Sequence, residues 1–66
     1  MPSFPDRLKE LRKAKGVTQK HMAELLSLTE RTYRHYEAGG IDPPTSKMET
    51  LADYFGVSVD YLLGRE

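Results

Sequence analysis

Two arginines and a histidine, Arg31, Arg34 and His35, fall within five residues near the middle of the chain. A guanidinium group presents a planar fork of N–H donors that can bind guanine O6 and N7, and its charge attracts phosphate. Glu30 can accept a hydrogen bond from the N4 amino group of cytosine, or it can simply stabilise the start of a helix through its charge. These residue types together are suited to contacting the base edges of a nucleic acid.

The spacing of aromatic residues predicts that these polar side chains lie on the outer face of a helix. With about 100° of rotation per residue from Glu30, Tyr33 falls at about 300° and Tyr36 at about 240°. The buried side of the helix is then centred at about 270° and the exposed side at about 90°. The side chains predicted on the exposed side are Arg31 at about 100°, Arg34 at about 40° and His35 at about 140°.

Turn residues divide the chain into five segments that have the periodicity of helices, at about 5–15, 18–27, 29–38, 46–55 and 58–63. The predicted helix starts are the N-cap residues Thr18, Thr29 and Ser58, and the possible capping boxes Ser3 with Asp6 and Ser46 with Glu49. A chain of 66 residues is too short for two separate cores. We therefore expect an all-α fold, a compact five-helix bundle forming a single domain over residues 1–66.

Apolar residues follow a helical spacing in each segment. The residues expected to face the core are Phe4, Leu8, Leu11, Met22, Leu25, Leu26, Tyr33, Tyr36, Met48, Leu51, Ala52, Phe55, Val59, Leu62 and Leu63. The second and third segments are separated by only about three residues, which forces two short helices to cross steeply. Residues 18–38 are therefore predicted to form a helix-turn-helix unit.

Several short stretches carry a resemblance to a known family. They are Arg7-Leu-Lys-Glu-Leu-Arg12, Thr18-Gln19, Tyr36-Glu37 and Phe55-Gly-Val-Ser-Val-Asp-Tyr-Leu-Leu-Gly64. In this order and spacing the chain resembles the Cro and phage-repressor type of helix-turn-helix domain, the Xre-like family with a lambda-repressor-like fold. The resemblance implies a transcriptional regulator, with repression as the expected mode. It implies a homodimer on a two-fold-related DNA operator with half-sites about 34 Å apart, and a recognition helix at about 29–38 in the major groove.

The resemblance also assigns roles to residues outside the exposed helix face. It implies a buried ion pair between Arg12 and Glu37, against which stands the alternative of two independent surface charges. Free N–H groups at the amino ends of the second and third helices are suited to binding phosphate. The expected phosphate contacts are Gln19, Lys20 and Thr29, together with the backbone amides of Gly39 and Gly40. Thr29 is equally explained by helix capping alone.

Three features of the sequence depart from the family pattern. Ser27 occupies the turn position usually given to glycine, where the backbone is expected to be left-handed. Tyr33 is larger than the usual β-branched residue and is expected to rest partly on the surface. The loop at 38–43 lacks the basic residues that often follow the recognition helix. We therefore expect moderate DNA affinity that depends strongly on dimerisation.

The charge of the chain is unevenly distributed. Ten basic residues balance ten acidic ones, but residues 1–35 hold eight Lys and Arg against four Asp and Glu, and residues 36–66 hold two against six. This polarity suits a positive face that meets a polyanion. The alternative is that Lys9, Lys13 and Lys15 merely solvate the first predicted helix. The competing hypothesis is a helical protein-interaction module, for example an antitoxin-like domain that binds a partner near Tyr33, Tyr36 and Ile41.

Other classes of function lack the residues that they need. The chain has no nucleophile–base set and no glycine-rich phosphate loop, so we expect neither an enzyme nor a cofactor. His21 and His35, fourteen residues apart and without any cysteine, lack the spacing of metal ligands. Residues 1–9 contain no apolar stretch typical of a secretory signal, and no membrane-spanning run follows. We expect a cytoplasmic protein, bacterial or phage-encoded by the resemblance.

Overall fold

The computed structural model describes residues 3–65, and all regular secondary structure in that range is helical. The helices are α1 (Phe4–Lys15), α2 (Gln19–Leu25), α3 (Glu30–Ala38), α4 (Thr45–Phe55) and α5 (Val59–Leu62). The predicted all-α fold is confirmed, and each predicted segment contains one helix. In the described part of the chain, no helix is long and apolar enough to cross a membrane.

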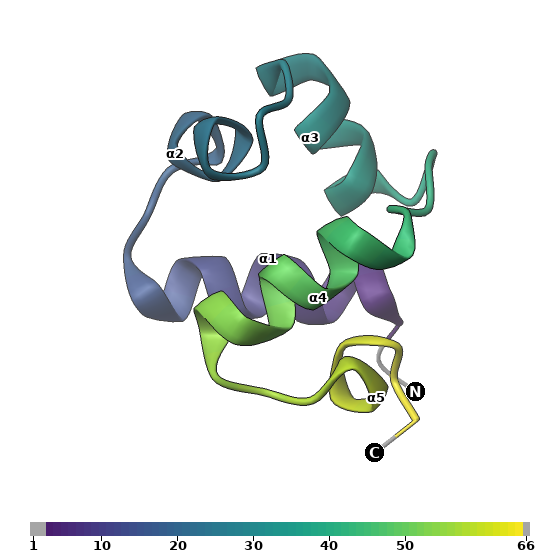
Figure 1. The fold of residues 1–66 in the computed structure, drawn as a ribbon. Coiled ribbons are helices and arrows are strands. Elements are labelled where there is room, and N and C mark those ends of the chain that lie inside the picture. The colour runs from purple at the N-terminus through teal and green to yellow at the C-terminus, as the bar shows by residue number, and fades with distance from the viewer. Residues whose placement is uncertain (1–2, 66) are drawn as a thin grey trace.

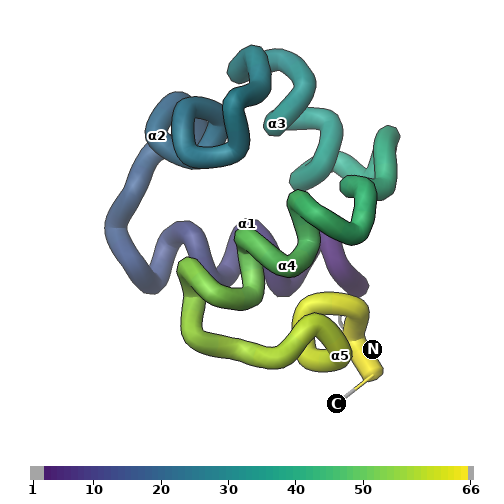
Figure 2. Tube along the Cα trace, viewed as in Figure 1, coloured from purple at the N-terminus to yellow at the C-terminus, as the bar shows by residue number. Residues whose placement is uncertain are grey.

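The helices pack around one core. α2 packs against α3, α1 packs against both α3 and α5, and α4 packs against α5. Figure 1 shows α2 and α3 together at the top of the molecule, α1 and α4 below them, with α4 in front of α1 in this view, and α5 at the bottom. The trace in Figure 2 shows the short turn from α2 to α3 and the longer loop from α3 to α4. The buried hydrophobic residues are Phe4, Leu8, Met22, Ala23, Leu26, Tyr33, Tyr36, Met48, Leu51, Ala52 and Leu62.

Three helices start as their N-cap residues predict. The capping oxygens are Thr18 Oγ1, which accepts from the His21 N–H at 3.0 Å, Thr29 Oγ1, which accepts from the Thr32 N–H at 3.2 Å, and Ser58 Oγ, which accepts from the Tyr61 N–H at 2.9 Å. Each of these bonds pairs one of the N–H groups that a helix leaves without a partner in its first turn. The starts of α2, α3 and α5 are therefore fixed by local sequence.

The two predicted capping boxes are wrong. Ser3 is the N-cap of α1, but its hydroxyl donates to Asp6 Oδ2 at 3.1 Å and caps no backbone N–H. A hydrogen bond to a charged carboxylate is stronger than one between neutral groups, which favours this alternative. Helix α4 starts before Ser46 because Pro44, in an extended conformation, is its N-cap. Ser46 thus lies inside the first turn and forms no capping box with Glu49.

Leu25 does not face the core as predicted, because it is 37% exposed. Its neighbours Met22, Ala23 and Leu26 are buried. At about 100° per residue from Met22, these three centre at about 50°, whereas Leu25 falls at about 300°. The small side chain of Ala23 lets α2 turn that side inward, and the buried stripe moves away from Leu25.

The turn between α2 and α3 contains Ser27 in a left-handed conformation, with φ of 57°. This confirms the left-handed backbone expected at this position, which glycine usually occupies. The turn is closed by hydrogen bonds from the Leu28 N–H to the Ala23 carbonyl at 2.8 Å and from the Ser27 N–H to the Glu24 carbonyl at 3.2 Å. The left-handed residue reverses the chain so that α3 starts three residues later.

Replacing Ser27 by Gly should stabilise the protein by about 0.5–1 kcal/mol. A left-handed backbone disfavours residues with a Cβ atom by about 1–2 kcal/mol, and the greater flexibility of unfolded glycine offsets part of the gain. Urea unfolding followed by circular dichroism measures the difference. The control is Ser27→Ala, which keeps the Cβ atom and should give no such gain. Equal stability of the Gly and Ala variants would contradict this account of the turn.

Candidate nucleic-acid interface

Helix α3 has one buried side and one exposed side. The buried side consists of Tyr33, Tyr36 and Glu37, and the exposed side presents Arg31, Arg34 and His35. The expectation that Tyr33 rests partly on the surface is wrong, since its exposure is 0%. Its ring lies in the core and edge-on to Tyr36, with the ring centroids 6.3 Å apart. The larger side chain is accommodated because its hydroxyl reaches a buried polar partner described below.

Arg34 and Glu30 form an ion pair on the exposed side of α3. Arg34 Nη2 donates to Glu30 Oε2 at 2.9 Å, and the two side chains are 57% and 43% exposed. An exposed pair of this i, i+4 spacing is worth about 0.3–0.5 kcal/mol, so it orients Arg34 but yields readily to a stronger partner. Within residues 3–65, no ion pair or hydrogen bond engages the side chain of Arg31. Arg31 is therefore the cation on this side that is ready to bind a ligand.

The residues predicted to contact phosphate lie in different settings. Lys20 is exposed on α2, and Thr29 is exposed at the N-cap of α3, where its hydroxyl also donates to Thr32 Oγ1 at 2.9 Å. Gln19, the first residue of α2, is only half-buried, but its side-chain Nε2 donates to Glu37 Oε1 at 3.1 Å. One of its two amide hydrogens is thus used inside the protein, and a second donor hydrogen remains on the same nitrogen.

The glycine amides predicted to approach phosphate are used inside the protein. Gly39 is the left-handed C-cap of α3, with φ of 85°, and its N–H donates to the His35 carbonyl. The Gly40 N–H donates to the same carbonyl at 2.9 Å. This geometry corrects the prediction, because an N–H that completes a helix end is no longer a free donor.

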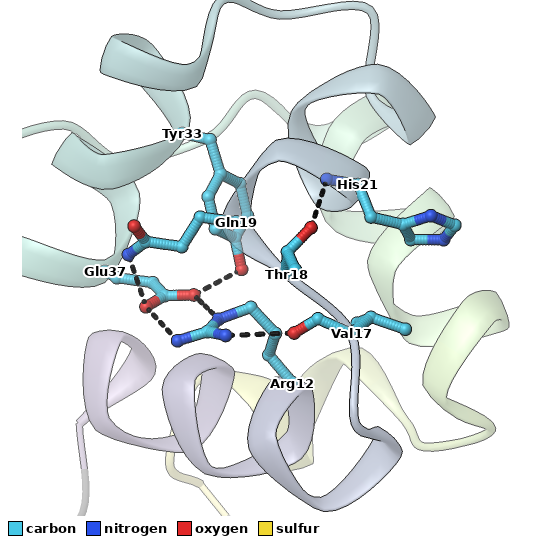
Figure 3. A network of polar contacts seen from close by, with 7 residues as sticks. All are labelled: Arg12, Val17, Thr18, Gln19, His21, Tyr33 and Glu37. Carbon is cyan, nitrogen blue, oxygen red and sulfur yellow. Dashed lines mark hydrogen bonds and ion pairs between the residues drawn. The ribbon is translucent and has the colours of Figure 1, made fainter.

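A network of polar side chains joins α1, α2 and α3 behind the exposed side of α3 (Figure 3). We call Arg12, Gln19, Tyr33 and Glu37 the Glu37 network. Arg12 Nε and Nη2 donate to the two carboxylate oxygens of Glu37 at 2.6 and 3.3 Å. Tyr33 Oη donates to Oε2 at 2.6 Å and Gln19 Nε2 donates to Oε1 at 3.1 Å, so each oxygen accepts two hydrogen bonds. The carboxylate has all of its acceptor positions filled.

Burial makes this network matter for stability. The side chains of Arg12 and Glu37 are 13% and 3% exposed, so they are not the independent surface charges of the alternative interpretation. Arg12 Nη1 also donates to the Val17 carbonyl at 3.0 Å, which ties the α1–α2 loop to the same site. Burial and the hydrogen bond to Glu37 raise the pKa of the Tyr33 phenol, so this hydroxyl stays a donor. The network holds α3 against α1 and the start of α2.

The network predicts a loss of stability in acid. Burial acts to raise the pKa of Glu37, but hydrogen bonds from Arg12, Tyr33 and Gln19 outweigh it and bring the pKa below its ordinary value of 4.5. Because the folded pKa lies below the unfolded one, the unfolded state binds more protons as the pH falls. The stabilisation by Glu37 is therefore complete above about pH 5 and disappears as the pH falls through the folded pKa.

Urea unfolding between pH 7 and pH 3 measures this effect. Other carboxylates titrate in the same range, so the quantity of interest is the difference between the wild-type chain and Glu37→Gln. We expect the stability advantage of the wild type to shrink steadily below about pH 5. Parallel stability curves for the two proteins would contradict the role assigned to the carboxylate.

Three contacts between distant segments were not predicted from the sequence. Lys47 Nζ in α4 donates to the Leu26 carbonyl at 2.6 Å, and Lys15 Nζ donates to the Tyr54 carbonyl at 3.2 Å. Tyr54 Oη lies 3.2 Å from His21 Nε2. These partners are 21 to 39 residues apart, and a helical pattern in the sequence gives no signal for them. Among the described residues, no group of three or more His, Cys, Asp or Glu could hold a metal ion.

The short turn between α2 and α3, the packing of these two helices against each other, and the exposed cationic side of α3 define a helix-turn-helix protein. Residues 8–62 match the helix-turn-helix family, and the chain belongs to that family. It is 40% identical over 60 residues to the SPbeta prophage-derived HTH-type transcriptional regulator YonR of Bacillus subtilis, covering 91% of this chain and 56% of that protein. It is 44% identical over 61 residues to the HTH-type transcriptional regulator AnsR of the same species, covering 92% and 53%.

A solved structure gives the same result for the fold. The structure of a transcriptional regulator from Listeria innocua superposes with a TM-score of 0.90 at 37% sequence identity, covering 94% of this chain and 58% of that one. The chain thus spans a little over half the length of the relatives that it matches. The family match and the similar regulators confirm the predicted family resemblance.

Proposed function

We propose that this chain binds double-stranded DNA as the DNA-binding domain of a transcriptional regulator, with α3 in the major groove. The observation that carries the proposal is the division of α3 into two sides. Tyr33 and Tyr36 are buried, and Arg31 and Arg34 extend outward beside the start of a helix. A helix of this kind fits the major groove, where arginine reads guanine through O6 and N7. Relatives named as transcriptional regulators support the same role.

Within this proposal, different residues of α3 contact different bases of the DNA. Arg31 is the main base reader because it lies in the first turn of α3 and its guanidinium is unengaged within the described range. Arg34 reads a second position once it leaves Glu30, and His35 lies further along the same side. Glu30 either accepts from cytosine N4 or only orients Arg34.

Phosphate contacts position the domain on the duplex. We assign them to Lys20, to the Thr29 hydroxyl and to the second amide hydrogen of Gln19. The amides of Gly39 and Gly40 are left out because both donate to the His35 carbonyl. The domain comprises residues 1–66, and we propose that it acts as a repressor in the cytoplasm of a bacterium.

We also propose that the chain binds as a homodimer. Two copies related by a two-fold axis would place their α3 helices in successive major grooves, about 34 Å apart. The loop after α3 provides no basic side chain, so one copy holds few phosphates by itself. A second copy doubles the number of contacts on one operator.

Selection of bound duplexes from a random library tests the proposal. We expect enrichment of a two-fold-related sequence with guanines in each half-site. Affinity for a selected duplex should fall steeply with salt, because each neutralised phosphate contributes about −0.9 to the slope of log affinity against log salt concentration. An unenriched library, or affinity that is indifferent to salt, would refute DNA binding and favour the protein-interaction module. The relatives, named as transcriptional regulators, give that alternative no support.

A further inference from the structure

We propose that Lys47 of α4 is a positioning residue for the recognition helix α3. It fixes the end of α2 and the turn that follows, and thereby sets the angle at which α3 leaves the protein. This inference rests on the proposed function, because its consequence is read in DNA binding. Lys47 itself contacts no DNA in this proposal.

The contact joins α4 to the last turn of α2. Lys47 Nζ donates to the Leu26 carbonyl at 2.6 Å, and Leu26 is the C-cap of α2. Carbonyl groups at the end of a helix have no partner within the helix, and they form the negative end of its dipole. An ammonium group satisfies both needs, because it supplies a hydrogen bond and a positive charge. A hydrogen bond of this kind is stronger than one between neutral groups.

The bonded carbonyl lies at the point where the chain reverses. Ser27, the next residue, has the left-handed φ of 57°, and Thr29, two residues further on, is the N-cap of α3. Leu28 between them donates its N–H to the Ala23 carbonyl at 2.8 Å. Any movement of the Leu26 peptide group therefore changes the direction in which α3 starts. The bond from Lys47 restrains that peptide group from outside the helix-turn-helix unit.

Lys47 is suited to this role because its own backbone is well anchored. The next residue, Met48, is 7% exposed, and Leu51 in the following turn is 0% exposed, so both hold α4 in the core. Lys47 is half-buried. Its ammonium group thus reaches Leu26 from a fixed base, which a mobile surface lysine does not have.

The first test measures the turn directly by amide hydrogen exchange. In Lys47→Met, which keeps the apolar stem and loses the donor, we expect the amide of Leu28 to exchange about tenfold faster. Lys47→Arg retains a charged donor and should stay within about twofold of the wild type. The matched control is Lys13→Met, which removes the same charge from an exposed position of α1. The amide of Tyr61, which is capped by Ser58 in α5, should exchange at the same rate in all variants.

The second test uses a duplex obtained from the library selection. Lys47→Met should bind about tenfold more weakly than the wild type, with reduced discrimination against a duplex altered at one enriched guanine. The salt slope should be unchanged, whereas loss of a lysine that contacts phosphate lowers it by about one. Binding by Lys47→Arg and by Lys13→Met should match the wild type within about twofold.

The possible outcomes separate the inference from the proposed function. Faster Leu28 exchange together with weaker binding at an unchanged salt slope supports the inference. Unchanged exchange, unchanged binding, a slope reduced by about one, or failure of Lys47→Arg to restore binding overturns it. A wild-type chain that binds no duplex defeats the proposed function and this inference together.

Discussion

Replacing Arg12 by Met should lower the free energy of unfolding by about 3 kcal/mol. The substitution removes the two hydrogen bonds and the charge that neutralise Glu37, whose side chain is 3% exposed. Loss of one partner from a buried ion pair leaves an uncompensated charge, at about 3–5 kcal/mol. We expect the lower end because Tyr33 and Gln19 still donate to the carboxylate. Urea unfolding at pH 7 measures the loss, which is large against a typical stability of about 5–15 kcal/mol.

Two companion variants test the cause of this loss. Adding Glu37→Gln to Arg12→Met removes the uncompensated charge and should recover part of the stability. The exposed ion pair of Arg34 and Glu30 is the matched control, since Arg34→Met should lower stability by less than about 1 kcal/mol. An Arg12→Met protein as stable as Arg34→Met would show that the Glu37 network contributes little.

Replacing Arg31 by Ala should weaken binding to a selected duplex by about 1–3 kcal/mol, which is about fivefold to 150-fold. The physical reason is the loss of a bidentate contact to one guanine, so preference should also relax at one base pair of each half-site. Binding titrations on the selected duplex and on single-base variants measure both effects. Stability should be unaffected, because Arg31 is exposed and the buried side of α3 is intact.

Lys13→Ala provides the matched control for Arg31→Ala. It removes one positive charge from an exposed position of α1 and should leave both affinity and sequence preference close to those of the wild type. A repeat of the library selection with Arg31→Ala gives the decisive comparison. If the enriched sequence is the same as for the wild type, Arg31 does not read a base.

Local signals in the sequence were sufficient for most of the fold. Thr18, Thr29 and Ser58 predicted helix starts correctly because a capping bond spans only three residues and depends little on the rest of the molecule. The aromatic spacing of Tyr33 and Tyr36 predicted the two sides of α3 for the same reason. Periodicity and capping are properties of short segments, so the packing of the helices against one another did not change them here.

The incorrect predictions concern residues for which the local sequence allows two arrangements and the packing of the helices determines which one forms. Leu25 has the apolar spacing of a core residue, but burial of Ala23 turns α2 and leaves Leu25 partly exposed. Ser3 can cap a backbone N–H or bind Asp6, and local sequence does not show which bond forms. From the sequence alone, the amides of Gly39 and Gly40 could bind phosphate. In the structure, both donate to the His35 carbonyl and complete the end of α3.

The sequence predicted only part of the Glu37 network. The family resemblance implied the pair of Arg12 and Glu37, but not the two further donors to the same carboxylate. Gln19 and Tyr33 reach Glu37 from α2 and from the preceding turn of α3, respectively. The contact of Lys47 could not be predicted from the sequence either, because its partner is a backbone carbonyl, which every residue type has. Contacts of this kind become apparent only when the helices have been placed in space.

If α3 reads DNA as proposed, its separation into two sides has a consequence for how this helix-turn-helix domain can diversify. Residues 31, 34 and 35 take no part in the core, whereas Tyr33, Tyr36 and Glu37 anchor the helix from behind. Substitutions on the outer side can therefore accumulate with little effect on folding, since surface changes usually alter stability by less than about 0.5 kcal/mol. Under the proposed function, one scaffold can then be retargeted to a new DNA sequence by exchanging a few neighbouring codons.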